Sequence, residues 1–377
     1  MADATRSGRI ANGRSYGGPG KYIQRAGELG RLADHLRPLG DTVFLLVDGH
    51  ILDRNGPAIV EAVRSAGIKV AVERFGGECC NEEIERVTSR LRESGAGVAV
   101  GIGGGKTADT TKMAAIAAGA RIVIAPTIAS TDAPCSAIAV RYDSHGVYQE
   151  AHRLPRNPDA VIVDSAVIAQ APVRFLVAGI GDALSTWFEA RSNLESGSSN
   201  LVTPHLPPPA AGIAIAKACH EVLMRDALAA KLAVERGALT QAVENIIEAN
   251  TLLSGLGFEN CGVSAAHGIH DGLTVLDETH GFFHGEKVAF GVLCLLTLEG
   301  RAMDEIEAMT RFCRLMGLPT RLADLNLGKS TKEDITRVAR SALAPGSATY
   351  KVPVPVTVEI VRDAIIATDA FTSQFEF

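Results

Sequence analysis

The chain has 377 residues, of which 46% are hydrophobic and 21% are charged, the balance of a folded globular protein rather than a disordered one. Its 43 Asp and Glu residues outnumber 37 Lys and Arg residues, and the resulting net charge of -6 argues against nucleic acid as a main partner. The length favours two domains, and without a membrane-spanning run or a secretory signal a cytoplasmic location is expected, with no membrane partner.

The first half of the chain alternates short β-branched runs with helical stretches. Strands are expected at 41–50, 68–75, 97–105, 121–127 and 159–164. Helices are expected between them at 55–67, 81–95 and 106–119. This alternation predicts βαβ units and a mostly parallel sheet. The segment 136–153 has the pattern of an antiparallel strand pair that turns at Ser144, His145 and Gly146.

Beyond Pro172 the strand signal fades, and apolar residues recur at helical spacing. Helices are expected at 173–192, 210–227, 240–257, 285–300 and 304–317. The sequence therefore predicts an α/β domain over residues 1–171 and an all-α domain over residues 172–377.

A glycine-rich turn, GIGGGKTAD, ends the strand expected at 97–105. Three consecutive glycines let backbone N–H groups approach an anion, and the helix that follows directs its positive end there. The turn matches neither the dinucleotide fingerprint, which needs glycine at Lys106, nor the P-loop, which needs glycine at Val100. Two interpretations therefore stand: a site for a phosphate-bearing cofactor, or a tight turn without a ligand.

Asp48 follows the apolar run VFLLV at the end of the first of these strands. A carboxylate at the carboxyl edge of a strand accepts hydrogen bonds from an adenosine ribose and repels a 2′-phosphate, which favours NAD over NADP. The alternative is a solvated turn aspartate before Gly49.

Asp182 lies in an otherwise apolar helical segment, GIGDALSTWF, where a carboxylate is costly unless it is paired or ligated. His267 and His270 follow in AAHGIHDG, and His280 and His284 follow in THGFFHGEK. An aspartate with several imidazoles is a ligand set for zinc, with iron also possible. The spacing does not match a zinc finger, so these residues indicate a metal site without showing which of them bind.

Seven segments in order along the chain resemble the glycerol dehydrogenase family, the zinc-dependent members of the iron-containing (group III) alcohol dehydrogenase superfamily. They are FGGECCNEEIERV, GIGGGKTADTTK, APTIASTDAPCSAIAVRY, GIGDALSTWFEAR, EANTLLSGLGFEN, AAHGIHDG and HGEKVAFG. The resemblance covers almost the whole chain. It implies the dehydroquinate synthase-like fold: a Rossmann-like parallel-sheet domain, an α-helical domain, and a metal between them.

The resemblance also implies the residues of the site. The metal ligands of the family fall on Asp182, His267 and His284, and Asp132 matches its substrate-side aspartate. His270, one turn from His267, is expected to orient the substrate or to relay a proton. The NAD contacts of the family fall on Asp48, Gly103, Gly104, Gly105, Lys106, Thr127, Ser130, Ser136, Ile138 and Tyr142.

One departure from the wider superfamily bears on the metal. Iron-type members have a fourth ligand, a histidine, four residues after the aspartate, and the corresponding residue here is Thr186. Three protein ligands with an open position are the arrangement of catalytic zinc, so zinc is expected rather than iron. The resemblance further implies a homo-oligomer, often an octamer.

The activity implied by the resemblance is reversible oxidation of glycerol to dihydroxyacetone, with zinc-assisted hydride transfer to NAD. One alternative keeps the scaffold and changes the substrate to another small vicinal diol, such as 1,2-propanediol or 2,3-butanediol, or to glycerol 1-phosphate. A phosphorylated substrate needs a basic pocket, and Lys287 alone offers little charge for one. Two interpretations change the class of protein instead: a P-loop-like nucleotide-binding switch, and a structural zinc protein, which would need a fourth His or Cys ligand.

Overall fold

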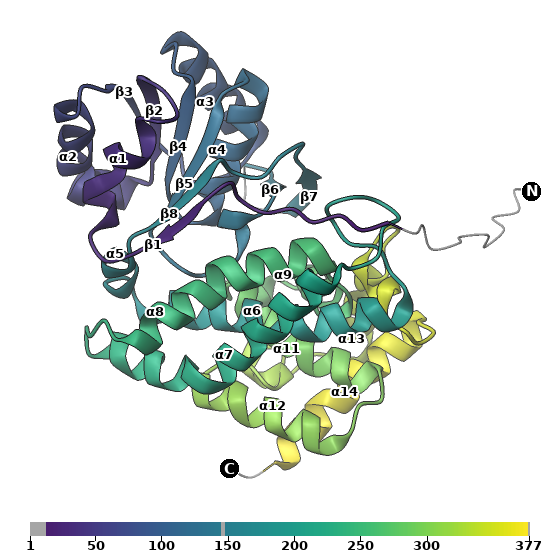
Figure 1. Ribbon diagram of the computed structural model, residues 1–377. Helices are drawn as coiled ribbons and strands as arrows, with labels where there is room; N and C mark the ends of the chain where they lie inside the picture. The colour runs from purple at the N-terminus through teal and green to yellow at the C-terminus, as the bar shows by residue number, and fades with distance from the viewer. Residues whose placement is uncertain (1–12, 145–147, 376–377) are drawn as a thin grey trace, which may run out of the picture.

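The computed structural model describes residues 13–144 and 148–375, and it confirms an α/β part followed by an all-α part. Figure 1 shows the strands with helices around them in the upper part of the molecule and a bundle of helices in the lower part. The first part ends with the short helix α5, Ser165–Ala169, and the long helix α6, Val173–Ser196, begins the second. The expected boundary between residues 171 and 172 falls between these two helices.

A six-stranded sheet in the order β1-β8-β5-β4-β2-β3 forms the centre of the first part, and its strand pairs are parallel. Parallel strands joined by helical crossovers are what the alternating sequence pattern predicts. The strands are β1, Tyr22–Gln24; β2, Thr42–Val47; β3, Lys69–Arg74; β4, Val98–Gly103; β5, Arg121–Pro126; and β8, Ala160–Val163.

Different helices cover the two faces of this sheet, which explains why its central strands are apolar throughout. On β2, Val43, Leu45 and Val47 pack into an apolar cluster with α1 and α2, whereas Phe44 and Leu46 pack into another with α3 and α4. Alternate residues of a strand point to opposite faces, so both sets are buried. The covering helices are α1, Leu32–Leu36; α2, Gly49–Ser65; α3, Asn81–Glu93; and α4, Gly105–Ala118.

The strand order reverses between β2 and β4. The chain runs from β2 to β3 at one edge, and from β4 through β5 to β8 on the other side. Open parallel sheets bind ligands outside the carboxyl ends of their strands at such a reversal. Asp48 directly follows β2 and Gly103 ends β4, so both residues lie at this point of the sheet.

A separate antiparallel pair is formed by β6, Ile138–Tyr142, and β7, Tyr148–Arg153, as the sequence predicts. The predicted turn at Ser144, His145 and Gly146 involves residues 145–147, which lie outside the described part of the chain.

The second part is helical, and its five predicted helical segments are present with shifted ends. Its helices are α6; α7, Ala210–Glu235; α8, Gln241–Glu248; α9, Ser254–Cys261; α10, Ala265–Leu273; α11, His284–Leu298; α12, Met303–Met316; α13, Lys332–Ala342; and α14, Val358–Gln374. Short 3-10 segments are η1, Glu28–Arg31; η2, Ala133–Cys135; η4, Asp277–Thr279; η5, Leu322–Leu325; and η6, Ala348–Lys351.

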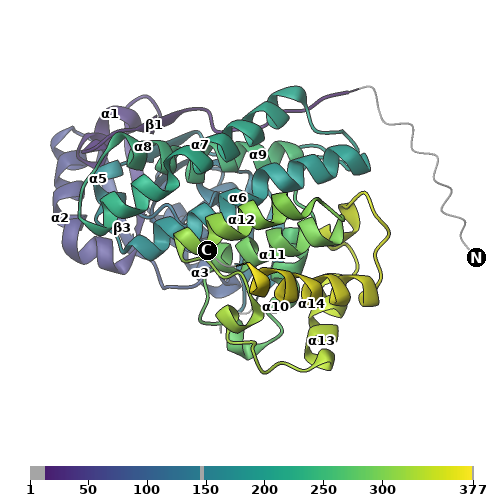
Figure 2. The same cartoon turned by 90° about the horizontal axis from the view of Figure 1, so that it is seen from below.

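In Figure 2, α10, α13 and α14 lie at the end opposite α1 and α2. No helix in the described residues is long and apolar enough to cross a membrane.

The helix predicted over 240–257 is interrupted by a π-helical turn, η3, Ala249–Leu253, between α8 and α9. Within this turn, Nδ2 of Asn250 donates to the carbonyl oxygens of Ala129 and Leu176, both at 3.0 Å. Such single π-helical turns are frequent at functional sites. Here the first residue after the turn is Ser254.

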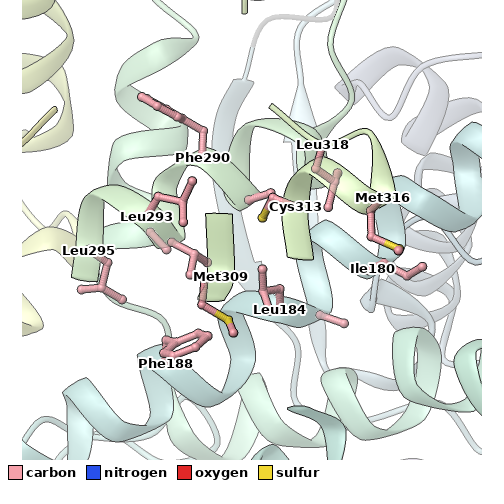
Figure 3. Packing of buried hydrophobic residues seen from close by; sticks show 14 of the residues in the cluster. Ile180, Leu184, Phe188, Phe290, Leu293, Leu295, Met309, Cys313, Met316 and Leu318 are labelled. Carbon is pink, nitrogen blue, oxygen red and sulfur yellow. The ribbon is translucent and has the colours of Figure 1, made fainter. Parts of the chain in front are cut away.

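The core of the helical part forms where α6, α11 and α12 pack together. Ile180, Leu184 and Phe188 recur at helical spacing on one face of α6. Figure 3 shows them gathered with Phe290, Leu293 and Leu295 of α11 and with Met309, Cys313 and Met316 of α12. This packing holds α6 against α11, the two helices that carry Asp182 and His284.

Candidate metal centre

Asp182, His267 and His284 come together from three helices, α6, α10 and α11. Their ligand atoms all lie within 4.8 Å of one another, and no further His, Cys, Asp or Glu of the described residues joins the group. Oδ1 of Asp182 lies 3.1 Å from Nε2 of His284 and 3.7 Å from Nε2 of His267. One carboxylate and two imidazoles match the three-ligand set of catalytic zinc, and they lack the fourth ligand that a structural zinc site needs.

The environment of Asp182 fits a bound cation. Its side chain is 2% exposed, and within the described residues its Oδ1 atom has no hydrogen bond of good geometry. Burial alone would raise the pKa of Asp182, but the imidazoles of His284 and His267 hold it below its ordinary value. A buried carboxylate oxygen without a hydrogen bond is costly unless a positive charge faces it. The residues present therefore fit a divalent metal ion.

Two glycines allow α6 and α11 to approach closely enough for this contact. A Cβ atom on Gly285 would overlap with the carbonyl oxygen of Ala178, and one on Gly181 would overlap with the carbonyl oxygen of Gly285. Gly181 precedes Asp182, and Gly285 follows His284. The close approach of the two backbones thus brings the carboxylate of α6 to the imidazole of α11.

The Nδ1 atom of each imidazole is engaged on the side away from Asp182. Nδ1 of His267 lies 2.6 Å from Oε2 of Glu189, and Nδ1 of His284 lies 3.1 Å from Nε2 of His270. Burial alone would lower the pKa of His267, but the carboxylates of Glu189, Asp182 and Asp132 raise it to about 10. Both imidazoles therefore present Nε2 toward Asp182, the geometry that metal-ligating histidines adopt.

His270 contacts the cluster through His284 and does not join the ligand group. Its Nδ1 atom lies 3.0 Å from Oδ1 of Asp271, and its Nε2 atom meets Nδ1 of His284. Burial, together with the charge of His284, lowers the pKa of His270 to about 3. When His284 is also neutral, a His270 that donates to Asp271 accepts from Nδ1 of His284, and Nε2 of His284 is then free to bind a metal ion.

Asp132 lies beside the cluster, in the loop that follows β5. Its backbone N–H donates to Oδ2 of Asp182 at 3.3 Å, and the hydroxyl of Ser254 donates to its Oδ2 at 2.7 Å. Oγ1 of Thr186 lies 2.9 Å from Oγ of Ser254. Because Ser254 donates to the carboxylate, Thr186 donates to Ser254. Burial, and then the charge of Asp182, raise the pKa of Asp132 well above its ordinary value.

The glycine-rich turn lies at the reversal point of the sheet. Gly104 is the N-cap of α4 and Gly105 its first residue. A Cβ atom on Gly103 would lie 3.0 Å from Cβ of Asp48, so these two residues are neighbours in space. Oδ1 of Asp48 accepts from the backbone N–H of His50 at 2.9 Å, which makes Asp48 the N-cap of α2. Asp48 therefore caps a helix through Oδ1, as a turn aspartate would. Its Oδ2 atom takes no part in this cap.

The other residues expected to contact NAD lie at the start of α4, in the segment after β5, and in β6. Nζ of Lys106 lies 5.0 Å from the ring centroid of Tyr142 and forms an ion pair with Glu78. Ser136 is fully buried, and its hydroxyl donates to the carbonyl oxygen of Ala133 at 3.3 Å. Thr127 directly follows β5, Ser130 lies in the loop beyond it, and Ile138 begins β6.

Glu189 and Ser254 also lie at this site, although neither is among the site residues expected from the sequence. Glu189 is seven residues after Asp182, hence on the same face of α6, and a second acidic residue at that spacing in an apolar helix is a usable signal. Ser254 gives no such signal, because its position depends on the π-helical turn that precedes it.

Comparisons with known proteins show which sequences and structures this chain resembles. Residues 19–165 match the family model of iron-containing alcohol dehydrogenases. The glycerol dehydrogenase of Thermotoga maritima is 47% identical over 94% of this chain and 96% of its own length. The glycolaldehyde reductase of Halobacterium salinarum is 40% identical over 93% and 96%. The solved structure of a probable glycerol dehydrogenase from Sinorhizobium meliloti is 64% identical, covers 96% of this chain and 100% of that one, and superposes with a TM-score of 0.91.

Proposed function

Because the chain belongs to the glycerol dehydrogenase family of iron-containing alcohol dehydrogenases, we propose that it is an NAD-dependent oxidoreductase that interconverts glycerol and dihydroxyacetone. The observation that carries the proposal is the convergence of Asp182, His267 and His284 beside Asp132. The purified protein is expected to form NADH from NAD and glycerol. Absence of NADH with glycerol and with other small vicinal diols would contradict the proposal.

Each side chain has a distinct part in the reaction that we propose. Asp182, His267 and His284 would hold the metal, and the turn at 103–106 with residues 127–142 would hold the cofactor. When bound, zinc supplies Lewis acidity that lowers the pKa of a substrate hydroxyl, and NAD supplies the acceptor for hydride. His270 would position His284, because both of its ring nitrogens are engaged by neighbouring side chains.

Asp132 would select polyols over simple alcohols by holding a second hydroxyl group of the substrate. Its backbone N–H is bound to Asp182, which sets its side chain next to the proposed metal ligands. Ser254 holds one oxygen of its carboxylate, and Thr186 in turn donates to Ser254. These two hydroxyl groups would keep the other oxygen available to the substrate.

Replacing Ser254 by alanine is therefore expected to impair glycerol oxidation more than oxidation of 2-propanol, which has no second hydroxyl group. The lost hydrogen bond corresponds to a decrease of about tenfold in kcat/KM for glycerol. The measurement is kcat/KM for both alcohols. Ser192→Ala serves as the control, because Ser192 is also fully buried and bound to a carboxylate, that of Glu299, away from the site. An equal loss for both alcohols would contradict the role proposed for Asp132.

We propose zinc as the metal. Thr186 occupies the position of the fourth ligand in iron-type relatives, and its hydroxyl is bound to Ser254 and not directed at the cluster. With three protein ligands, the cluster retains the open position that catalytic zinc requires. We also propose NAD over NADP, because the carboxylate of Asp48 at the end of β2 would repel a 2′-phosphate.

An uncharged substrate fits this site better than a phosphorylated one. Lys287, the cation that the sequence offers in this region, is 7% exposed, and burial lowers its pKa. The carboxylate of Asp271 opposes this decrease in pKa, so any charge that Lys287 carries already faces a carboxylate. A phosphate group binds to several donors and positive charges together, which Lys287 alone does not supply.

A further inference from the structure

Glu189 is a buried carboxylate that the proposed reaction does not use. It lies on α6 two helical turns after Asp182, and its side chain is 1% exposed. A buried carboxylate is destabilising unless several donors compensate it. The donors of Glu189 all come from one place, the N-terminus of α10, which carries His267.

One oxygen of Glu189 caps this helix. Oε1 accepts from the backbone N–H of Ser264 at 2.7 Å and from that of His267 at 3.0 Å. Ser264 stands at the N-cap position, but its own side chain makes no capping hydrogen bond. A carboxylate is favourable at a helix N-terminus, where N–H groups lack partners and the helix dipole is positive. Glu189 thus replaces the missing cap from a different helix.

The other oxygen of Glu189 binds the imidazole of His267. Oε2 lies 2.6 Å from Nδ1, so Nδ1 carries a proton and donates it to the carboxylate. When His267 is neutral, as a metal ligand has to be, the second nitrogen, Nε2, is then unprotonated. This is the nitrogen that lies 3.7 Å from Oδ1 of Asp182.

We propose that Glu189 is a positioning residue that holds His267 in the tautomer and orientation needed to bind the metal. The inference rests on the proposed function, because it assumes that Asp182, His267 and His284 bind a metal ion. His284 has a different partner at Nδ1, the imidazole of His270, so Glu189 is the carboxylate partner of this ligand pair. Carboxylates that bind the far nitrogen of a ligating histidine typically change metal affinity by about 10- to 100-fold.

Glu189→Gln separates this role from the cap. The amide oxygen of glutamine still accepts from the N–H groups of Ser264 and His267, so the cap of α10 is kept. Its NH₂ group then faces Nδ1 of His267, which has to become an acceptor, and the proton moves to Nε2. The variant therefore keeps the helix cap while favouring the tautomer that cannot bind the metal.

The test is the dissociation constant for zinc of the chelator-stripped protein, measured by competition with a chromophoric chelator, together with the melting temperature of the metal-free form. Glu189→Gln is expected to weaken zinc binding by about 10- to 100-fold, with a melting temperature close to that of Glu299→Gln. Glu299 is the control for loss of a buried carboxylate, because its side chain is also 1% exposed and is bound by Ser192 and Arg301, remote from the ligand group. Glu299→Gln is expected to bind zinc as the unmodified protein does.

The possible outcomes separate the two claims. Tight zinc binding by the unmodified protein with unchanged binding by Glu189→Gln would overturn the inference alone. Failure of the unmodified protein to bind zinc would overturn both this inference and the metal site of the proposed function. If Glu189→Gln does not fold, ¹⁵N spectra of histidine-labelled, zinc-loaded unmodified protein decide instead. A proton on Nδ1 of His267 would support the inference, and a proton on Nε2 would overturn it.

Discussion

Replacing Asp182 by asparagine is expected to reduce glycerol oxidation by at least about a thousandfold. The substitution removes the carboxylate of the three-ligand group and the charge that faces both imidazoles. Lewis-acid assistance by a bound metal supplies several kcal/mol of transition-state stabilisation, and each 1.4 kcal/mol, roughly, is a factor of ten in rate. The measurements are kcat/KM with glycerol and the zinc content after dialysis.

A matched control for this variant lies close to the site. Asp277 is 98% exposed in the segment between α10 and α11, so Asp277→Asn makes the same chemical change without touching the ligand group. It is expected to retain both zinc and activity. An Asp182→Asn protein that is folded, retains stoichiometric zinc and oxidises glycerol at the unmodified rate would show that Asp182 is not a ligand.

Replacing Gly285 by alanine is expected to damage the site without altering any ligand. The added Cβ atom would overlap with the carbonyl oxygen of Ala178 and lie 2.8 Å from the backbone nitrogen of Asp182. Since both obstacles are backbone atoms of α6, the helices have to separate. Overpacking of this kind costs about 3 kcal/mol in the free energy of unfolding. Zinc binding is expected to weaken as well, because His284, next to Gly285, moves away from Asp182.

The control for this substitution is Gly281→Ala. A Cβ atom on Gly281 would meet nothing within 4 Å, and this glycine precedes the same helix. The measurements are the free energy of unfolding, from chemical denaturation, and the zinc affinity, from titration, of both variants. Equal stability of the two variants, with equal zinc affinity, would show that α6 and α11 do not depend on this close approach.

The parallel sheet was predictable from the sequence because its central strands are mostly apolar and alternate with helical segments. The strand β1 was not predictable, because it has only three residues and forms a strand only through its pairing with β8. Helix α10 was also missed. Its glycines interrupt the helical pattern, yet they fit against neighbours: a Cβ atom on Gly272 would lie 3.0 Å from Cβ of Ala342. Tertiary packing, not local propensity, accounts for both elements.

The site was predictable in its residue types but not in its contacts. An aspartate in an apolar helix and clustered histidines indicated a metal site here, and the family resemblance pointed to Asp182, His267 and His284 among them. Which nitrogen of each imidazole faces Asp182 depends on Glu189 and His270, and these partners are set by how α6, α10 and α11 pack. The link from Asp132 to Ser254 depends on the π-helical turn η3, which replaces a stretch of the predicted regular helix.

The decisive measurement is NADH formation from NAD and glycerol by the chelator-stripped protein, before and after zinc is restored. Removal of the metal is expected to abolish NADH formation, and zinc is expected to restore it more fully than iron(II). A Ser254→Ala protein measured alongside links the same reaction to Asp132. Undiminished NADH formation without metal would contradict the metal-dependent mechanism. No NADH from any small diol, with zinc bound and NAD present, would contradict the proposed activity itself.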